Sequence, residues 1–196
     1  MSLRFLLFLA LAASLPGAAA APLAVTVTDT AGKPVEGAVV AVSVAGAATV
    51  SHGATAQVAQ EGRQFVPQIT VVQTGTAITF PNRDVVRHHV YSFSAIKAFE
   101  LKLYAGNPST PVVFDKAGTA VLGCNIHDKM TAWVVVVDTP YFGKTDAAGQ
   151  ARIDIPDGEH RMRVWHARQA EAPAAVEQKV RAGTPATVRL AALPDA

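Results

Sequence analysis

The sequence predicts an all-β protein, and three observations lead to that prediction. The chain is rich in Val, Thr, Ala, Gly and Pro. Its apolar residues fall in short runs that alternate with polar residues, and turn-forming residues separate the runs. The pattern gives no convincing amphipathic helix beyond a short helical turn near residues 94–99. Short strands at such intervals are typical of β-sandwiches and β-barrels.

The first twenty residues have the layout of a secretory signal peptide. Arg4 precedes an apolar run over residues 5–15, and small residues close the segment at 18–20. The apolar run is too short to span a membrane. We therefore expect a signal peptide over 1–20, with cleavage after Ala20, and a soluble mature protein exported to a bacterial periplasm.

The strands follow from alternation and turn residues. Two are expected within 65–84, about a Thr-Gly turn, and two within 111–124, joined by residues 116–118. Residues 150–156 and 160–167 read as a hairpin about the turn at 157–159. Residues 168–180 are ambiguous, although Pro173 argues against a long helix there. The other expected strands are 23–29, 35–44, 88–94, 131–138 and 184–191.

Charge gives no indication of a nucleic-acid partner. The 17 Lys and Arg residues nearly balance the 15 Asp and Glu residues. The chain has neither a basic run nor an aromatic platform on its expected strands, so a nucleic-acid surface is not predicted.

Residues 123–130, which read GCNIHDKM, contain the only cysteine of the chain. An exported protein normally pairs its cysteines, so a lone thiol is either inert and buried or a reactive or ligating group. The spacing favours a ligand, because Cys124, His127 and Met130 follow one another at intervals of three residues. An electron-transfer copper site uses two imidazoles, a thiolate and a weak axial thioether. This short loop offers three of those four donors.

The fourth donor is expected from His88 or His89, which stand together at the head of a predicted strand. Adjacent residues of a strand point to opposite faces, so only one of the two can face the ion. The other is a neighbour of the site.

Two segments resemble the cupredoxin family, most closely its amicyanin-like members. In FPNRDVVRHHVYSF, an Asn, an acidic residue two positions later and His-x-Val at the strand start match the first-histidine segment, and this alignment selects His88. FDKAGTAVLGCNIHDKMTAWVVV is similar to the segment with the other ligands. The resemblance covers about residues 58–138 and implies one type 1 copper ion. Its implied ligands are His88, Cys124, His127 and Met130.

The sequence departs from this pattern at two places. His89 stands where cupredoxins usually have an Asn that ties the two ligand loops together. His89 is expected either to donate the same bond through a ring nitrogen or to leave the loops more loosely connected. Ile126 and Asp128 stand where the amicyanin loop has prolines.

A second resemblance lies on both sides of the first. VTVTDTAGKPVEGAVVAV and GKTDAAGQARIDIPDGEHRMRVWHA are similar to the two parts of a carboxypeptidase regulatory-like (transthyretin-like) sandwich. We therefore expect one sandwich, built from residues 21–49 and 139–196, that is interrupted by a cupredoxin domain over residues 50–138. The alternative is two consecutive domains. Proteins with this combination resemble those labelled methylamine utilization proteins.

The leading functional hypothesis is a periplasmic electron carrier with a transient redox partner and no enzymatic activity. The alternatives are a copper carrier or chaperone, and a binding or scaffold protein whose cupredoxin is vestigial. An oxidase or nitrite reductase is disfavoured because a second copper centre needs more histidine ligands. His52, His160 and His166 are isolated, and surface or packing roles are expected for them. The sequence does not predict an oligomeric state.

Overall fold

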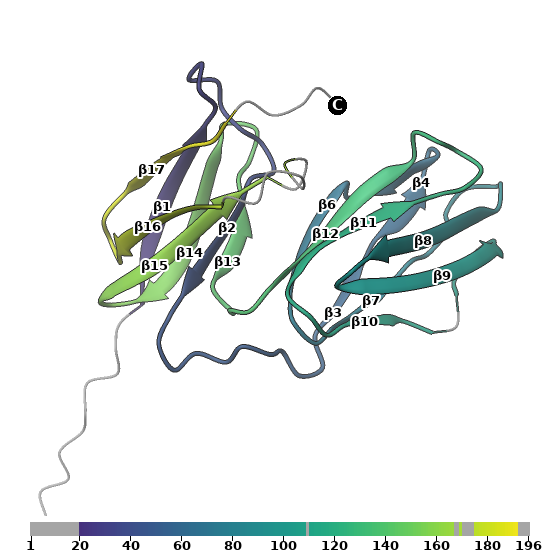
Figure 1. Ribbon diagram of the computed structural model, residues 1–196, viewed down its shortest axis with the longest axis horizontal. Helices are drawn as coiled ribbons and strands as arrows, with labels where there is room; N and C mark the ends of the chain where they lie inside the picture. The colour runs from purple at the N-terminus through teal and green to yellow at the C-terminus, as the bar shows by residue number, and fades with distance from the viewer. Residues whose placement is uncertain (1–19, 109, 167–168, 170–174, 192–196) are drawn as a thin grey trace, which may run out of the picture.

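The computed structural model describes residues 20–108, 110–166, 169 and 175–191, and its named elements in these ranges are all β-strands. The predicted all-β class is therefore confirmed. The strands form two sandwiches that lie side by side (Figure 1). Apart from Ala20, the expected signal peptide lies outside the described residues. A helix able to cross a membrane does not occur in the described part of the chain.

The inserted sandwich, residues 55–137, contains a five-stranded sheet in the order β6-β12-β11-β8-β9 and a three-stranded sheet in the order β10-β7-β3. Inward side chains of both sheets, such as Phe80, Phe114 and Leu122, share one buried core. The short strands β4 and β5 pair with each other. The strands are β3 (Thr55–Gln57), β4 (Ala59–Glu61), β5 (Gln64–Val66), β6 (Ile69–Gln73), β7 (Thr76–Thr79), β8 (His88–Ser94), β9 (Lys97–Tyr104), β10 (Val112–Phe114), β11 (Gly118–Gly123) and β12 (Thr131–Val137).

The flanking sandwich takes its strands from both ends of the chain. One sheet has the order β14-β1-β17 and the other β13-β2-β15-β16, and a second buried core lies between them. The strands are β1 (Ala20–Thr28), β2 (Val39–Ser43), β13 (Phe142–Lys144), β14 (Gln150–Pro156), β15 (Glu159–Trp165), β16 (Val176–Arg181) and β17 (Ala186–Arg189).

Strand pairing places the N-terminal strands with the C-terminal ones. Strand β1 pairs with β14 and β17, and β2 pairs with β13 and β15. The chain thus leaves the flanking sandwich after β2 and returns to it at β13 (Figure 1). Whether residues 21–49 and 139–196 behave as one folding unit, independent of 50–138, stays a prediction.

Two sequence predictions were wrong. Residues 150–156 and 160–167 do not form a hairpin, because β14 pairs with β1 while β15 pairs with β2 and β16 in the opposite sheet. The inward residues Ile153 and Met162 belong to one core, so the chain crosses between layers at the turn and packs the two apolar rows face to face. The helical turn expected near 94–99 is instead a tight β-turn that leads into β9.

A third apolar cluster joins the two sandwiches. Val39 and Ala41 of β2 pack against Ile69 of β6 and against Val135 and Val137 of β12. Polar contacts accompany it: the Lys144 ammonium donates to the Ile69 carbonyl oxygen at 2.5 Å, and Arg163 pairs with Asp138 at 2.7 Å. Burial lowers the pKa of Lys144, although the carboxylate of Glu36 opposes this shift.

Candidate metal centre

Two segments of the inserted sandwich bring the expected ligand residues to one end of it. His88 begins β8, Cys124 directly follows β11, and His127 and Met130 lie in the loop between β11 and β12. Strands β8 and β11 are neighbours in the sheet, and Gly123 pairs with Tyr91. The loop is closed by a hydrogen bond of 2.8 Å from the Met130 N–H to the His127 carbonyl oxygen.

His88, Cys124 and His127 converge through their donor atoms. Sγ of Cys124 lies 4.0 Å from Nδ1 of His88 and 3.7 Å from Nδ1 of His127. The two imidazole ring centroids are 5.0 Å apart. The ligand atoms of these three side chains all lie within 4.8 Å of one another. Among the described residues, no other group of three or more His, Cys, Asp or Glu side chains converges in this way. Two imidazole nitrogens and a thiol sulfur at this spacing can share one small metal ion.

The cluster is largely shielded from water. The exposed fraction is 0% for His88, 4% for Cys124 and 2% for Met130, whereas His127 is only half-buried. Met130 packs in the same core cluster as Cys124. The ring of His127 is therefore the part of the cluster that reaches the surface.

Asp84 fixes the orientation of His88. Its Oδ2 accepts a hydrogen bond of 2.7 Å from Nε2 of His88. An ionised carboxylate can only accept, so Nε2 carries the proton and Nδ1 is left with a free lone pair toward Cys124. The arrangement therefore prepares Nδ1 of His88 to bind a metal.

The same carboxylate is held by the β4–β5 turn. The backbone N–H groups of Gly62 and Arg63 donate to its two oxygens at 2.8 and 2.9 Å. Burial acts to raise the pKa of Asp84, but the bonds from Arg63, His88 and Gly62 outweigh burial and hold the pKa below its ordinary value. Asp84 is thus an ionised anchor between this turn and His88.

His89 lies on the opposite face of the sheet from His88, as alternation along the strand predicts. Its Nε2 contacts Oε1 of Glu100 at 2.8 Å, while its Nδ1 is buried without a hydrogen-bond partner among the described residues. His89 therefore does not make the bond between the ligand loops that was one of its two expected roles. The loops are connected instead through the β8–β11 pairing.

A buried polar network lies behind the site. Nε2 of Gln60 donates to the Phe80 carbonyl oxygen at 2.9 Å and to the Tyr104 hydroxyl at 2.5 Å. Burial raises the pKa of Tyr104 to about 12; the bond from Gln60 opposes this shift, and the nearby Cys124 thiol adds to it. Sequence reasoning did not identify Gln60 or Tyr104, because the two residues are 44 positions apart.

In the sequence, Asp84 was identified only as the acidic residue of the first-histidine segment, and no function was predicted for it. The signal that could have revealed its role is a carboxylate four residues before an expected ligand histidine. Glu100 has no comparable signal, since its partner is eleven residues away on another strand.

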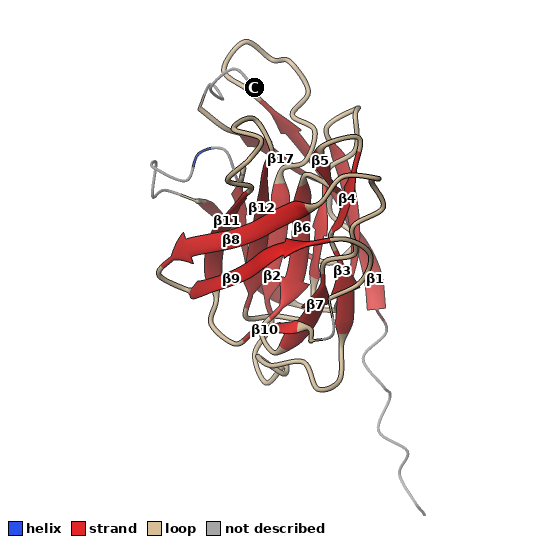
Figure 2. Ribbon diagram, turned by 90° about the vertical axis from the view of Figure 1, so that its right-hand side faces the viewer, coloured by secondary structure: helices blue, strands red, loops and turns tan. Residues whose placement is uncertain are grey.

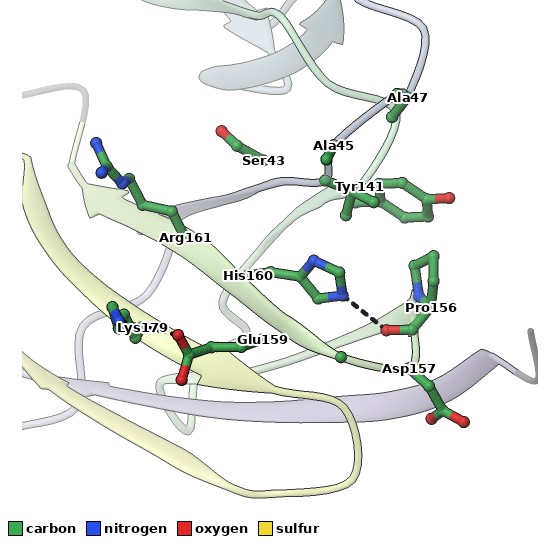
Figure 3. A pocket seen from close by; sticks show the side chains of 13 residues that line it. Ser43, Ala45, Ala47, Tyr141, Pro156, Asp157, Glu159, His160, Arg161 and Lys179 are labelled. Carbon is green, nitrogen blue, oxygen red and sulfur yellow. Dashed lines mark hydrogen bonds and ion pairs between the residues drawn. The ribbon is translucent and has the colours of Figure 1, made fainter.

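The other histidines lie away from this cluster. His52 is exposed, and His166 is buried in the flanking sandwich. His160 lines an open cavity of about 680 Å³ at one end of the flanking sandwich, where its Nε2 donates to the Pro156 carbonyl oxygen at 2.8 Å (Figure 3). In the same cavity Lys179 pairs with Glu159 at 2.9 Å. None of these histidines joins a second cluster with metal-binding spacing in the described part of the chain.

Comparison with known proteins gives structural matches alone. No family model and no curated protein matches the sequence. Matching solved structures include the copper-containing nitrite reductase NirK from Thermus scotoductus, at 24% identity and a TM-score of 0.39, over 45% of this chain and 25% of that one. A purple cupredoxin from Nitrosopumilus maritimus matches at 22% identity and a TM-score of 0.37, over 41% and 98%. A variant of amicyanin matches at 21% identity and a TM-score of 0.39, over 50% and 97%.

Proposed function

We propose that the protein binds one copper ion through His88, Cys124, His127 and Met130 and carries single electrons between redox partners. The observation that carries this proposal is the convergence of two Nδ1 atoms and one thiol sulfur within 4.8 Å. Bound copper would supply a one-electron couple between Cu(I) and Cu(II), and a mixed thiolate and imidazole donor set suits both states.

The residues of the site support this role in distinct ways. Asp84 orients His88 before metal arrives, so little reorganisation is needed on binding. Burial of Cys124 and Met130 excludes water and protects the thiol from oxidation. A half-buried His127 provides a short route between the site and a partner at the surface.

The docking rim is formed by the loops that bear the ligand residues. Ile126 is 48% exposed beside His127, and Val85, in the loop before His88, is fully exposed. Lys129 adds a positive charge to the same loop as Ile126. The same loops also expose Asp128 and Arg87, so the rim combines apolar side chains with a few charges of both signs, and such a mixed surface is suited to the small, transient contacts that redox partners make.

Burial also distinguishes the proposed role from that of a copper carrier. A carrier must release its metal to an acceptor, which requires accessible donor atoms. His88 and Cys124 are almost fully buried, so slow metal exchange is expected here. The N-terminal sequence supports export to the periplasm, and the resemblance to methylamine utilization proteins supports a redox role without naming an amine substrate.

The experiment is a titration of the purified mature protein with Cu(II), followed by protein-film voltammetry and transfer of the metal to a chelator. We expect one copper per chain, a reversible one-electron couple and slow release. Met130→Leu should retain copper and raise the reduction potential, because the axial donor is lost. Rapid release without a reversible couple would favour the carrier function instead.

A further inference from the structure

The segment that precedes β8 is fixed on both sides by backbone hydrogen bonds. On one side, Gln60 of β4 donates its N–H to the Pro81 carbonyl oxygen at 2.9 Å and accepts the N–H of Arg83 at 2.9 Å. On the other side, Asn82 donates its N–H to the Gly106 carbonyl oxygen, beyond the end of β9, at 2.8 Å. The backbone that leads to the first proposed ligand is therefore held between two neighbouring segments.

The side chain of Gln60 strengthens this connection. It is fully buried, with an exposed fraction of 0%. Its Nε2 donates to the Phe80 carbonyl oxygen at 2.9 Å and to the Tyr104 hydroxyl at 2.5 Å, and that hydroxyl donates to the same carbonyl oxygen at 2.5 Å. Because Phe80 directly follows β7, the three bonds form a closed triangle that joins β4, β9 and the start of the segment before β8.

Tyr104 reaches this triangle because β9 contains a β-bulge. In the β8–β9 ladder Val90 pairs with Leu101. Two positions earlier on β8, His88 pairs with Tyr104, which is three positions later than Leu101 on β9. The extra residue turns Tyr104 to the same side of the strand as Leu101, and both pack against the buried core. The two strands lie side by side at the front of the molecule in Figure 2, and the bulge places Tyr104 next to His88.

Burial of the Gln60 amide is unfavourable for folding. Its Oε1 is buried and has no hydrogen-bond partner among the described residues. The amide cannot be turned over, since Oε1 would then face the Phe80 carbonyl oxygen and two acceptors would repel each other. A leucine has a similar size and would bury no polar atom at this position. Stability of the fold therefore does not explain why an amide stands here.

Given the copper site proposed above, we propose that Gln60 is a positioning residue for the copper centre. Its Nε2 holds the Tyr104 hydroxyl and the Phe80 carbonyl oxygen together, and this fixes the segment that places Nδ1 of His88 opposite Sγ of Cys124. Gln60 touches neither imidazole nor thiol in the hydrogen bonds that it makes, so it acts on the centre through the backbone of its neighbours.

Such positioning matters because the two oxidation states of copper prefer different arrangements of donors. Cu(II) favours a tetragonal arrangement. If the segment before β8 is held less firmly, the His88 ring is free to shift toward that arrangement, and Cu(II) is then favoured over Cu(I). Loss of the Gln60 amide should therefore lower the reduction potential and alter the absorption band between the thiolate and copper.

The test compares Gln60→Leu with wild type. We expect one copper per chain, an affinity that is about tenfold weaker, a shifted thiolate-to-copper band and a lower reduction potential. Urea denaturation of the metal-free protein should give a stability close to that of wild type, because removal of the unpartnered Oε1 offsets the lost bonds of Nε2. A merely structural role would lower this stability and leave the band and the potential unchanged.

Thr76→Val is the matched control. Thr76 is 3% exposed at the other end of β7, and its hydroxyl donates to the Gln73 carbonyl oxygen at 2.7 Å. The variant removes a buried hydrogen bond from the same sandwich at a distance from the site. It should lower the stability of the metal-free protein and leave the copper band and the potential as in wild type.

Tyr104→Phe tests whether Gln60 acts through the hydroxyl that it binds. It should shift the potential in the same direction as Gln60→Leu, and the double variant should shift it no further than the larger of the two single changes, because both remove the same bond. Fully additive shifts would overturn the proposal.

Two other results are decisive. A wild type that shows the band, together with a Gln60→Leu variant whose affinity, band and potential are unchanged, would overturn the positioning role alone. A wild type that binds no copper or lacks the band would overturn the proposed copper site, and the positioning role with it.

Discussion

The carboxylate of Asp84 accepts a hydrogen bond of 2.7 Å from Nε2 of His88, and this leaves Nδ1 of the same ring facing Sγ of Cys124. The ring is therefore oriented by the protein itself. Since Asp84 also accepts the N–H groups of Gly62 and Arg63, a single side chain joins the β4–β5 turn to the candidate metal centre.

Asp84→Asn should lower the free energy of unfolding of the metal-free protein by about 1–3 kcal/mol, because an amide cannot accept all of these bonds. Urea denaturation measures the loss. Asp128→Asn is the control, since it removes the same charge from an exposed position in the ligand loop. Its effect should stay within about 0.5 kcal/mol. Equal losses in the two variants would show that charge, and not the bonds of Asp84, is responsible.

The effect of Asp84→Asn should depend on pH. The pKa of Asp84 is lowered in the folded protein, so its contribution to stability is complete above the unfolded-state pKa of about 4 and is lost as the pH falls through the folded-state value. The stability difference between wild type and Asp84→Asn should therefore be constant from neutral pH down to about 4 and shrink below it. A difference that persists unchanged below that range would contradict the assigned role of Asp84.

His88 and His89 form a matched pair of neighbours for testing the ligand assignment. His88→Ala should abolish binding at the proposed copper site, because Nδ1 of His88 faces Cys124. His89→Ala should leave copper bound, because His89 lies on the other face and contacts Glu100. Copper stoichiometry and the visible spectrum of each variant provide the measurement. The reverse outcome would mean that the register of β8 is shifted by one residue.

Much of this arrangement follows from local sequence. Alternation in HHVYSFS predicts that only one of the two histidines faces inward, and the structure has His88 inward and His89 outward. Val-rich runs predict β2 and β12 because a buried strand needs apolar side chains on both faces. The close spacing of Cys124 and His127 predicts that both belong to one loop, and their donor atoms do converge.

Pairing between distant strands could not be predicted in the same way. Residues 150–156 and 160–167 each alternate, but alternation does not say whether two strands join one sheet or face each other across a core. Strand β9 was missed because its outer residues Glu100 and Lys102 are charged and its turn resembles the start of a helix. The hydrogen bonds that the β4–β5 turn donates to Asp84 join residues more than twenty positions apart in the sequence.

The interrupted flanking sandwich can be tested with fragments. A chain that begins at residue 139 lacks β1 and β2, so β14 loses its partner β1, and β13 and β15 lose their shared neighbour β2. We expect it to be unfolded and sensitive to proteases, because its sheet edges are unpaired. Joining residues 23–48 to it through a short linker should restore a folded unit.

The fragment of residues 50–138 provides the complementary measurement. It contains every strand of the inserted sandwich and all four proposed ligand residues, so we expect it to fold and to bind copper. A protease-resistant 139–196 fragment would argue for two consecutive domains instead.

The visible spectrum after addition of Cu(II) to the purified protein tests the central claim most directly. Wild type should develop an intense blue band from charge transfer between the Cys124 thiolate and the metal, at one copper per chain. Cys124→Ser should lack this band, because a hydroxyl is not a soft anionic donor. A Cys124→Ser protein that remains blue, or a wild type that binds copper without the band, would contradict the assignment of this cluster as a type 1 copper site.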